Sequence, residues 1–244
     1  MNNSITLKQA RPEVQQKFMT GVYRWMVLAL AISGLAAYAS AYIPLVANAD
    51  PTKPPLALVD LIYAAANGMG MWALIIAELV LVFTLSARIR KMSLSSAKIM
   101  FLVYSLINGI TLSVIFLVYT STSIAQVFFI SALLFGSMSI YGARTKKDLT
   151  SAGRYLMMAV FGIIIASVIN IFFKSSGLDW LISIIAVVVF TGLTAYDTQK
   201  MMRIAQYNDG SENFQKVAII GALELYLDFI NIFLHLLRLF GNRN

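Results

Sequence analysis

The sequence predicts an all-α, polytopic membrane protein folded as a bundle of seven transmembrane helices. Of its 244 residues, 59% are hydrophobic and only 12% are charged, whereas soluble domains have about 45–50% apolar and 25% charged residues. The mean hydropathy is +0.77. Only helices and closed barrels satisfy their backbone groups in lipid. The apolar runs are continuous, without the alternation typical of barrel strands, so we expect helices.

Seven apolar stretches are long enough to cross a hydrocarbon core of about 30 Å, which takes roughly 20 helical residues. They cover residues 23–43, 68–86, 97–119, 123–141, 154–173, 178–199 and 217–239. All five prolines precede residue 56, so no proline interrupts the later stretches. The first stretch is too long for a signal peptide and is followed by further spans, so we expect it to be retained. Residues 1–22 are then a short basic tail, and residues 23–244 a single transmembrane domain.

Lysine and arginine are unequally distributed between the two predicted sides of the membrane. Fifteen lie in the N-terminal tail and in the loops on its side. The other side has only Lys53, Lys174, Arg238 and Arg243. The positive-inside rule therefore places the N-terminus in the cytoplasm. Because Arg238 and Arg243 lie on the side with few basic residues, two paths stay open for the final segment. It either crosses the membrane outward, or it re-enters and turns back.

This distribution also accounts for the formal net charge of +8. No lysine and arginine run resembles a nucleic-acid patch. We therefore expect lipid, and no nucleic acid, as a partner of the basic residues.

Charged side chains at membrane depth cost about 2.5–3.5 kcal/mol each, so the acids inside the predicted spans need an explanation. They are Glu78, Asp197, Glu224 and Asp228. In the last span Glu224, Asp228, Asn231 and His235 follow one helical face. This polar face should meet protein or water, which favours a central position for the last helix. Glu224 and Asn231 are candidates for lining a pore or holding a latch, and His235 is interpreted as a packing residue.

Two other spans carry shorter polar stripes. Thr191 and Thr194 lead to Asp197, and Ser105, Asn108 and Thr111 share a face in the third span. Ser, Thr and Asn at helical spacing usually form hydrogen bonds between helices, and we expect this of the third span. Glu78 is either a structural partner of a neighbouring helix or a pore residue.

Asp197 and Asp228 lie on consecutive spans joined by a short loop and lack an obvious basic partner at membrane depth. Two carboxylates about 4 Å apart repel by roughly 4 kcal/mol at an effective dielectric of 20. Such a pair must share a proton, recruit a lysine or arginine, or bind a cation. With no cysteine in the chain, oxygen ligands favour a hard cation such as Ca²⁺. Pairing requires the sixth span to extend past Gln199 or the seventh to begin after Val217.

At these residues the chain resembles the Bax inhibitor-1 (transmembrane Bax inhibitor motif) family, and most of all its bacterial inner-membrane members. The resemblance rests on residues 190–200 (FTGLTAYDTQK) and 225–242 (LYLDFINIFLHLLRLFGN), with support from residues 135–149 (FGSMSIYGARTKKDL). It implies a bundle with the last helix surrounded by the other six, and a pH-sensitive calcium leak across the bacterial inner membrane.

The resemblance also implies roles for particular residues. Asp197 and Asp228 match the family's proton-sharing aspartates, which act as pH sensor and gate, and they are the expected Ca²⁺ contacts. Arg88 matches an arginine that latches onto this pair, and Glu78 matches a membrane-embedded acid. Glu224 and His235 depart from the family motif. No resident cofactor is implied; Ca²⁺ and protons are the expected ions.

Two other functions stay open at the sequence level. A cation/proton antiporter uses the same coupled acids, and a regulatory membrane protein would bind partner helices or proteases. An intramembrane aspartyl protease also places aspartates on neighbouring helices, the first after a tyrosine, as in Tyr196 and Asp197. Its Gly-x-Gly-Asp pattern and later Pro-Ala-Leu element are missing here. We therefore expect no enzyme activity.

Overall fold

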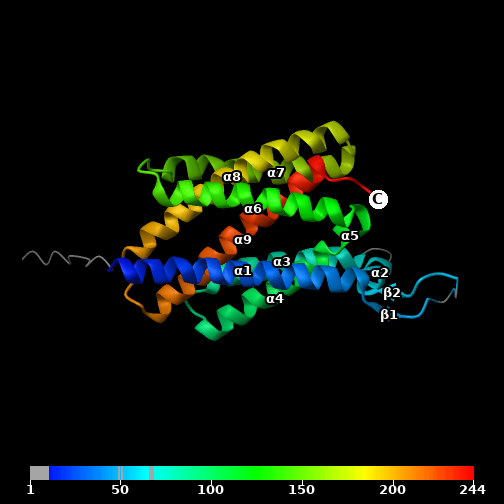
Figure 1. Ribbon diagram of the computed structural model, residues 1–244, viewed down its shortest axis with the longest axis horizontal. Helices are drawn as coiled ribbons and strands as arrows, with labels where there is room; N and C mark the ends of the chain where they lie inside the picture. Colours follow the sequence, from blue (N-terminus) through cyan, green and yellow to red (C-terminus); the bar gives the residue numbers. More distant parts are fainter. Residues whose placement is uncertain (1–10, 49, 51, 66–68) are drawn as a thin grey trace, which may run out of the picture. The chain divides into compact units, whose positions relative to one another are not determined.

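The computed structural model describes residues 11–48, 50, 52–65 and 69–244. Seven of its helical segments are long and apolar enough to cross a membrane, which confirms the predicted fold class (Figure 1). These segments are α1 (Pro12–Tyr42), α3 (Met69–Arg88), α4 (Leu94–Leu112) with α5 (Val114–Val118), α6 (Ser121–Arg144), α7 (Thr150–Phe173), α8 (Ser176–Ala205) and α9 (Glu212–Phe240).

The segment between the first two spans contains short elements that hydropathy did not predict. Strand β1 (Pro44–Val46) pairs antiparallel with β2 (Leu56–Ala57), and helix α2 (Leu58–Ala64) follows directly. The Asp60 carboxylate accepts a hydrogen bond from the Ala57 amide at 2.9 Å, which satisfies one free donor at the start of α2. Residues 49, 51 and 66–68 of this segment lie outside the described residues.

The helices extend beyond the apolar stretches that predict them. Helix α1 begins at Pro12 and so includes half of the predicted tail; proline is favoured at a first helical position, where no amide donor is needed. Helix α8 continues past Gln199 to Ala205. This extension is one of the two conditions given above for the pairing of Asp197 with Asp228. Helix α9 begins at Glu212, earlier than expected, and is unbroken over 29 residues. At 1.5 Å per residue it is long enough to cross the membrane, which favours crossing over re-entry.

The chain groups into two compact units, and the single transmembrane domain of the sequence analysis stays a prediction. The C-terminal unit consists of the chain up to Arg24 together with Gln126–Phe240, and the N-terminal unit consists of Trp25–Ala125 together with Gly241–Asn244. Both units contain the same kind of apolar helix, so hydropathy has no signal for the division.

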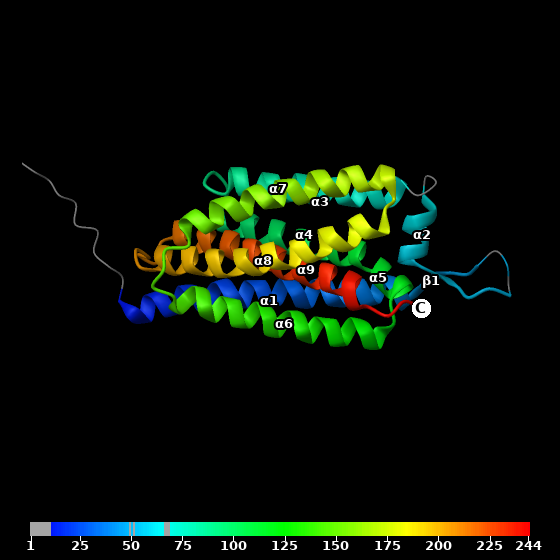
Figure 2. The same cartoon turned by 90° about the horizontal axis from the view of Figure 1, so that it is seen from above.

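In the C-terminal unit, α8 packs against both α7 and α9 (Figures 1 and 2). Two glycines allow close approach to α8. A Cβ atom at Gly142 would collide with the backbone of Ala195, and one at Gly153 would collide with the ring of Tyr196. Helices α6 and α7 therefore reach α8 at the two residues directly before Asp197.

A chain of hydroxyl groups joins three helices of the same unit. The Tyr23 hydroxyl of α1 contacts Ser139 Oγ of α6, and Ser139 Oγ lies 3.0 Å from Thr198 Oγ1 of α8. Ser139 and Thr198 are buried, and buried hydroxyls need such partners. Because Thr198 follows Asp197, these contacts help to set the rotation of α8 at the predicted sensor.

Helix α9 is the most deeply buried of the seven spans. Within its apolar stretch 67% of the residues are buried, against 0% in α7. Phe229 packs edge-on against Phe128 and Phe135 of α6, with ring centroids 5.3 and 5.7 Å apart. This burial agrees with the central position predicted for the C-terminal helix, because a helix surrounded by protein can carry polar residues that lipid would not accommodate.

The N-terminal unit has its own interhelical contacts. The Ser33 hydroxyl of α1 donates to the Ser105 carbonyl of α4 at 2.7 Å, and a Cβ atom at Gly109 would collide with Ser33 and Ala36. The C-terminal residues pair with the end of α5. The Thr120 amide donates to the Asn242 carbonyl, and the Asn244 amide donates to the Val118 carbonyl, both at 3.0 Å.

Candidate functional site

Asp197 of α8 and Asp228 of α9 are buried at the contact between their helices. Asp197 is only 8% exposed and Asp228 only 4%. Asp228 lies within electrostatic reach of Asp197, Glu224 and Lys200. The structure therefore brings together the two aspartates and Glu224, all of which the sequence singled out, and it adds Lys200. We call these four residues the acidic cluster.

Lys200 is the basic member of the acidic cluster. Its Nζ lies 2.6 Å from Glu224 Oε1 and 3.8 Å from Asp197 Oδ1. Sequence reasoning assigned Lys200 to a cytoplasmic loop, because hydropathy ended the span at Gln199. A usable signal was present, since residues three apart on a helix are neighbours and Lys200 follows Asp197 by three. Two carboxyl groups thus contact the ammonium group, and Asp228 lies within its electrostatic reach.

Some polar atoms of this region have no hydrogen-bond partner. Within the described part of the chain, Asp228 Oδ2, Glu224 Oε2 and Thr191 Oγ1 are buried and unpartnered. A buried carboxylate oxygen without a donor is costly, so such atoms call for an explanation at a site. The two carboxylate oxygens give the acidic cluster the capacity to accept a proton or contact a cation.

The acidic cluster does not have the arrangement of a multidentate metal centre. Among the described residues, no three or more His, Asp or Glu side chains are grouped so that they could hold a metal ion. Stable Ca²⁺ sites use 6–8 oxygen ligands. The expected contact of Ca²⁺ with Asp197 and Asp228 stays a prediction.

The remaining polar residues of the α9 face make local or packing contacts. Asn231 Nδ2 donates to the Leu227 carbonyl of its own helix at 2.8 Å. His235 Nδ1 lies 3.3 Å from the Ser183 hydroxyl of α8, in agreement with a packing role. Arg238 is one of the four basic residues that the positive-inside rule does not explain, and it forms an ion pair of 2.9 Å with Asp179.

Glu78 is a partner of the third predicted span. Its carboxylate accepts hydrogen bonds from Asn108 Nδ2 at 2.9 Å and from Thr111 Oγ1 at 2.5 Å. These contacts join α3 to α4 and support the structural alternative for Glu78. They also confirm that the polar stripe of the third span forms hydrogen bonds between helices.

Arg88 is the last residue of α3 and is exposed. It belongs to the N-terminal unit, whereas the acidic cluster belongs to the C-terminal unit. Its expected role as a latch on the aspartates therefore stays a prediction.

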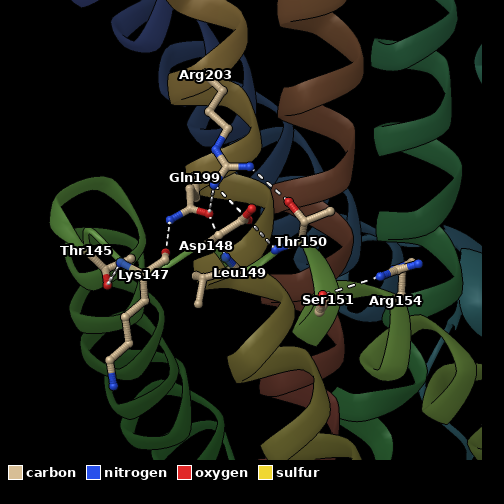
Figure 3. Close-up of polar contacts among 9 residues, drawn as sticks. All are labelled: Thr145, Lys147, Asp148, Leu149, Thr150, Ser151, Arg154, Gln199 and Arg203. Atoms are coloured by element: carbon tan, nitrogen blue, oxygen red, sulfur yellow. Dashed lines mark hydrogen bonds and ion pairs between the residues drawn. The ribbon is translucent and has the colours of Figure 1, made fainter.

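Gln199 and Arg203 form a second polar group on α8 that sequence reasoning missed (Figure 3). Gln199 Nε2 donates to the Lys147 carbonyl at 2.8 Å, and Gln199 Oε1 accepts from the Leu149 amide at 2.9 Å. Arg203 donates to Asp148 Oδ1 at 2.8 Å and to Thr150 Oγ1 at 2.9 Å. These bonds hold the α6–α7 loop against α8, a few residues beyond Asp197.

Comparison with known proteins finds a matching family and several similar proteins. A family model described as "Inhibitor of apoptosis-promoting Bax1" matches residues 15–244. The inner membrane protein YbhL of Escherichia coli (strain K12) is 44% identical over 230 residues, which cover 93% of this chain and 92% of that protein. A protein of Borreliella burgdorferi is 42% identical over 242 residues, 98% of each chain. A protein of Rickettsia prowazekii is 40% identical over 229 residues, 93% of this chain and 90% of its own.

Proposed function

The chain belongs to the Bax inhibitor-1 family, and on this basis we propose that it is a pH-sensitive leak for Ca²⁺ and related cations in the bacterial inner membrane, with Asp197 and Asp228 as its proton-sharing gate. The membrane assignment is supported by the seven apolar spans and by the name of the Escherichia coli relative, an inner membrane protein. In this proposal, an N-terminus in the cytoplasm follows from the charge distribution.

The observation that carries the proposal is the unpartnered, buried Asp228 Oδ2 within reach of two other carboxyl groups. Acids this close cannot all be ionised without a compensating charge. A proton and a metal cation are the two mobile charges that can supply it. When a proton binds, the attraction of the acidic cluster for a cation falls, so proton concentration and cation passage are linked.

Lys200 has the role of an internal counter-ion in this proposal. Its ammonium group contacts Glu224 and Asp197, which are carboxylates that a passing cation would also contact. The lysine and the permeant ion therefore compete for the same oxygens. This competition keeps the leak small while the Lys200–Glu224 pair is intact.

The test is Ca²⁺ flux into liposomes that contain the purified protein, measured between pH 5 and 8. The wild type is compared with Asp197→Asn/Asp228→Asn and with the matched variant Asp50→Asn/Asp209→Asn, whose acids lie in loops. We expect a wild-type leak that changes with pH, a flat pH profile in the first variant, and a wild-type profile in the matched variant.

The possible results separate the proposal from its alternatives. An unchanged pH profile in Asp197→Asn/Asp228→Asn would show that these residues are not the sensor. Ca²⁺ accumulation against its gradient, driven by an imposed proton gradient, would identify an antiporter. Flux no greater than that of empty liposomes, from protein of verified fold, would overturn the leak and point to a regulatory partner-binding role.

A further inference from the structure

The loop between α6 and α7 is basic and is held in a defined conformation. Besides its bonds to Gln199 and Arg203, the Lys147 amide donates to Thr145 Oγ1 at 3.3 Å. Figure 3 shows the Lys147 side chain pointing away from these contacts. The loop backbone is therefore held against α8 while the charged end of Lys147 points away from it.

The charges of this loop are not balanced locally. Between residues 144 and 154 the only acid is Asp148, and it is paired with Arg203 of α8. Hydrogen bonds from Thr150, with the Arg203 guanidinium beside them, hold the pKa of Asp148 well below its usual range. Four exposed cations have no ion-pair partner in the part of the chain that the structure describes. They are Arg144, Lys146, Lys147 and Arg154.

Helix α7 continues from this basic loop as an apolar surface. Arg154, Met158, Phe161 and Ile165 are spaced by four, three and four residues, so they follow one face of the helix. The three apolar residues are exposed, and none of the residues in the most apolar stretch of α7 is buried. Tyr155, beside Arg154, is also exposed, and tyrosine is enriched where a membrane meets water.

We propose that the α6–α7 loop and this face of α7 form a selective binding surface for anionic phospholipids. The lipid phosphate binds Arg154, and the acyl chains lie over Met158, Phe161 and Ile165. A guanidinium group matches the geometry of a phosphate, and the neighbouring loop cations add long-range attraction. A zwitterionic phospholipid would gain the apolar contacts but much less from the charges.

The proposal is tested by counting bound lipids with native mass spectrometry. The intact protein in detergent is mixed with equal amounts of phosphatidylglycerol and phosphatidylcholine. We expect the wild type to retain phosphatidylglycerol preferentially. Arg154→Gln should lower this preference about fivefold, which corresponds to the attraction that one basic residue contributes at an anionic membrane surface. Arg154→Lys should keep part of it. The matched control is Arg90→Gln, which removes an exposed arginine after α3.

Three results would overturn the proposal. An Arg154→Gln preference equal to the wild type would show that Arg154 does not bind the headgroup. An equal loss in Arg154→Gln and Arg90→Gln would show general surface attraction without a defined site. Millimolar inorganic phosphate is added in a further arm. If it displaces the bound phosphatidylglycerol completely, the ligand is a phosphate group alone; retention of the lipid supports a phospholipid surface.

Discussion

Among single residues, Lys200 and Glu224 make the closest charged contact of the described C-terminal unit, at 2.6 Å. Their side chains are 36% and 28% exposed, so solvent weakens the pair compared with a fully buried one. Removing Lys200 leaves the Glu224 carboxylate unpaired and within electrostatic reach of the buried Asp197 and Asp228. The stability of this pair is therefore tied to the two aspartates of the acidic cluster.

We expect Lys200→Met to lower the free energy of unfolding by about 1–2 kcal/mol, because it leaves Glu224 without its counter-ion. Adding Glu224→Gln should restore part of the loss by removing the unpaired charge. Thermal unfolding in detergent measures both effects. Lys91→Met, at an exposed lysine, serves as the control. Equal stability of the Lys200→Met and Lys91→Met variants would contradict a stabilising pair.

At the scale of secondary-structure elements, close helix packing places Asp197. Gly142 of α6 and Gly153 of α7 meet Ala195 and Tyr196 on α8, so the approach of both helices depends on the missing Cβ atoms. Each helix also contains a glycine with open space around it, Gly136 in α6 and Gly162 in α7. The chain thus offers an internal control for each close contact.

We expect Gly142→Ala and Gly153→Ala to destabilise the protein by about 1–3 kcal/mol each, as overpacking does. Gly136→Ala and Gly162→Ala should be neutral or slightly stabilising, because alanine favours a helix by up to about 1 kcal/mol over glycine. Thermal unfolding of the four variants in the same detergent provides the comparison. Similar losses at all four positions would exclude close packing at α8 as the cause.

At the scale of the whole molecule, the charge distribution predicts its orientation in the membrane. This distribution assigns the α6–α7 loop to the predicted cytoplasmic side and the β1–β2 segment to the predicted opposite side. Because the chain has no cysteine, a single introduced cysteine is a unique label site. Lys147 and Lys53 are exposed and suit this purpose.

In spheroplasts, a membrane-impermeant maleimide should label Lys53→Cys directly. Lys147→Cys should be labelled only after the membrane is permeabilised, since the positive-inside rule places its loop in the cytoplasm. The reverse pattern would invert the orientation. Labelling of both variants in intact spheroplasts would place the two loops on one side and contradict the predicted number of crossings between them.

Much of the architecture follows from sequence alone, because crossing a membrane imposes a local requirement. About 20 consecutive apolar residues are needed for each span, so hydropathy located all seven helices. The acids inside those spans stood out for the same reason, since their cost in lipid does not depend on their neighbours. The sequence thus determined the fold class, the polar face of α9, and Asp197 and Asp228 as the candidate pair.

Only the tertiary structure decided how far the helices extend and which groups meet. Hydropathy assigns polar helix ends to loops, as it does for the turn of α8 that contains Lys200. The sequence leaves two interpretations of Glu78, and only the fold shows that Asn108 and Thr111 donate to its carboxylate, which supports the structural one. The pairing of Lys200 with Glu224 joins residues 24 positions apart. Such contacts depend on the rotation and depth at which two helices pack, and these are properties of the folded chain that no local pattern contains.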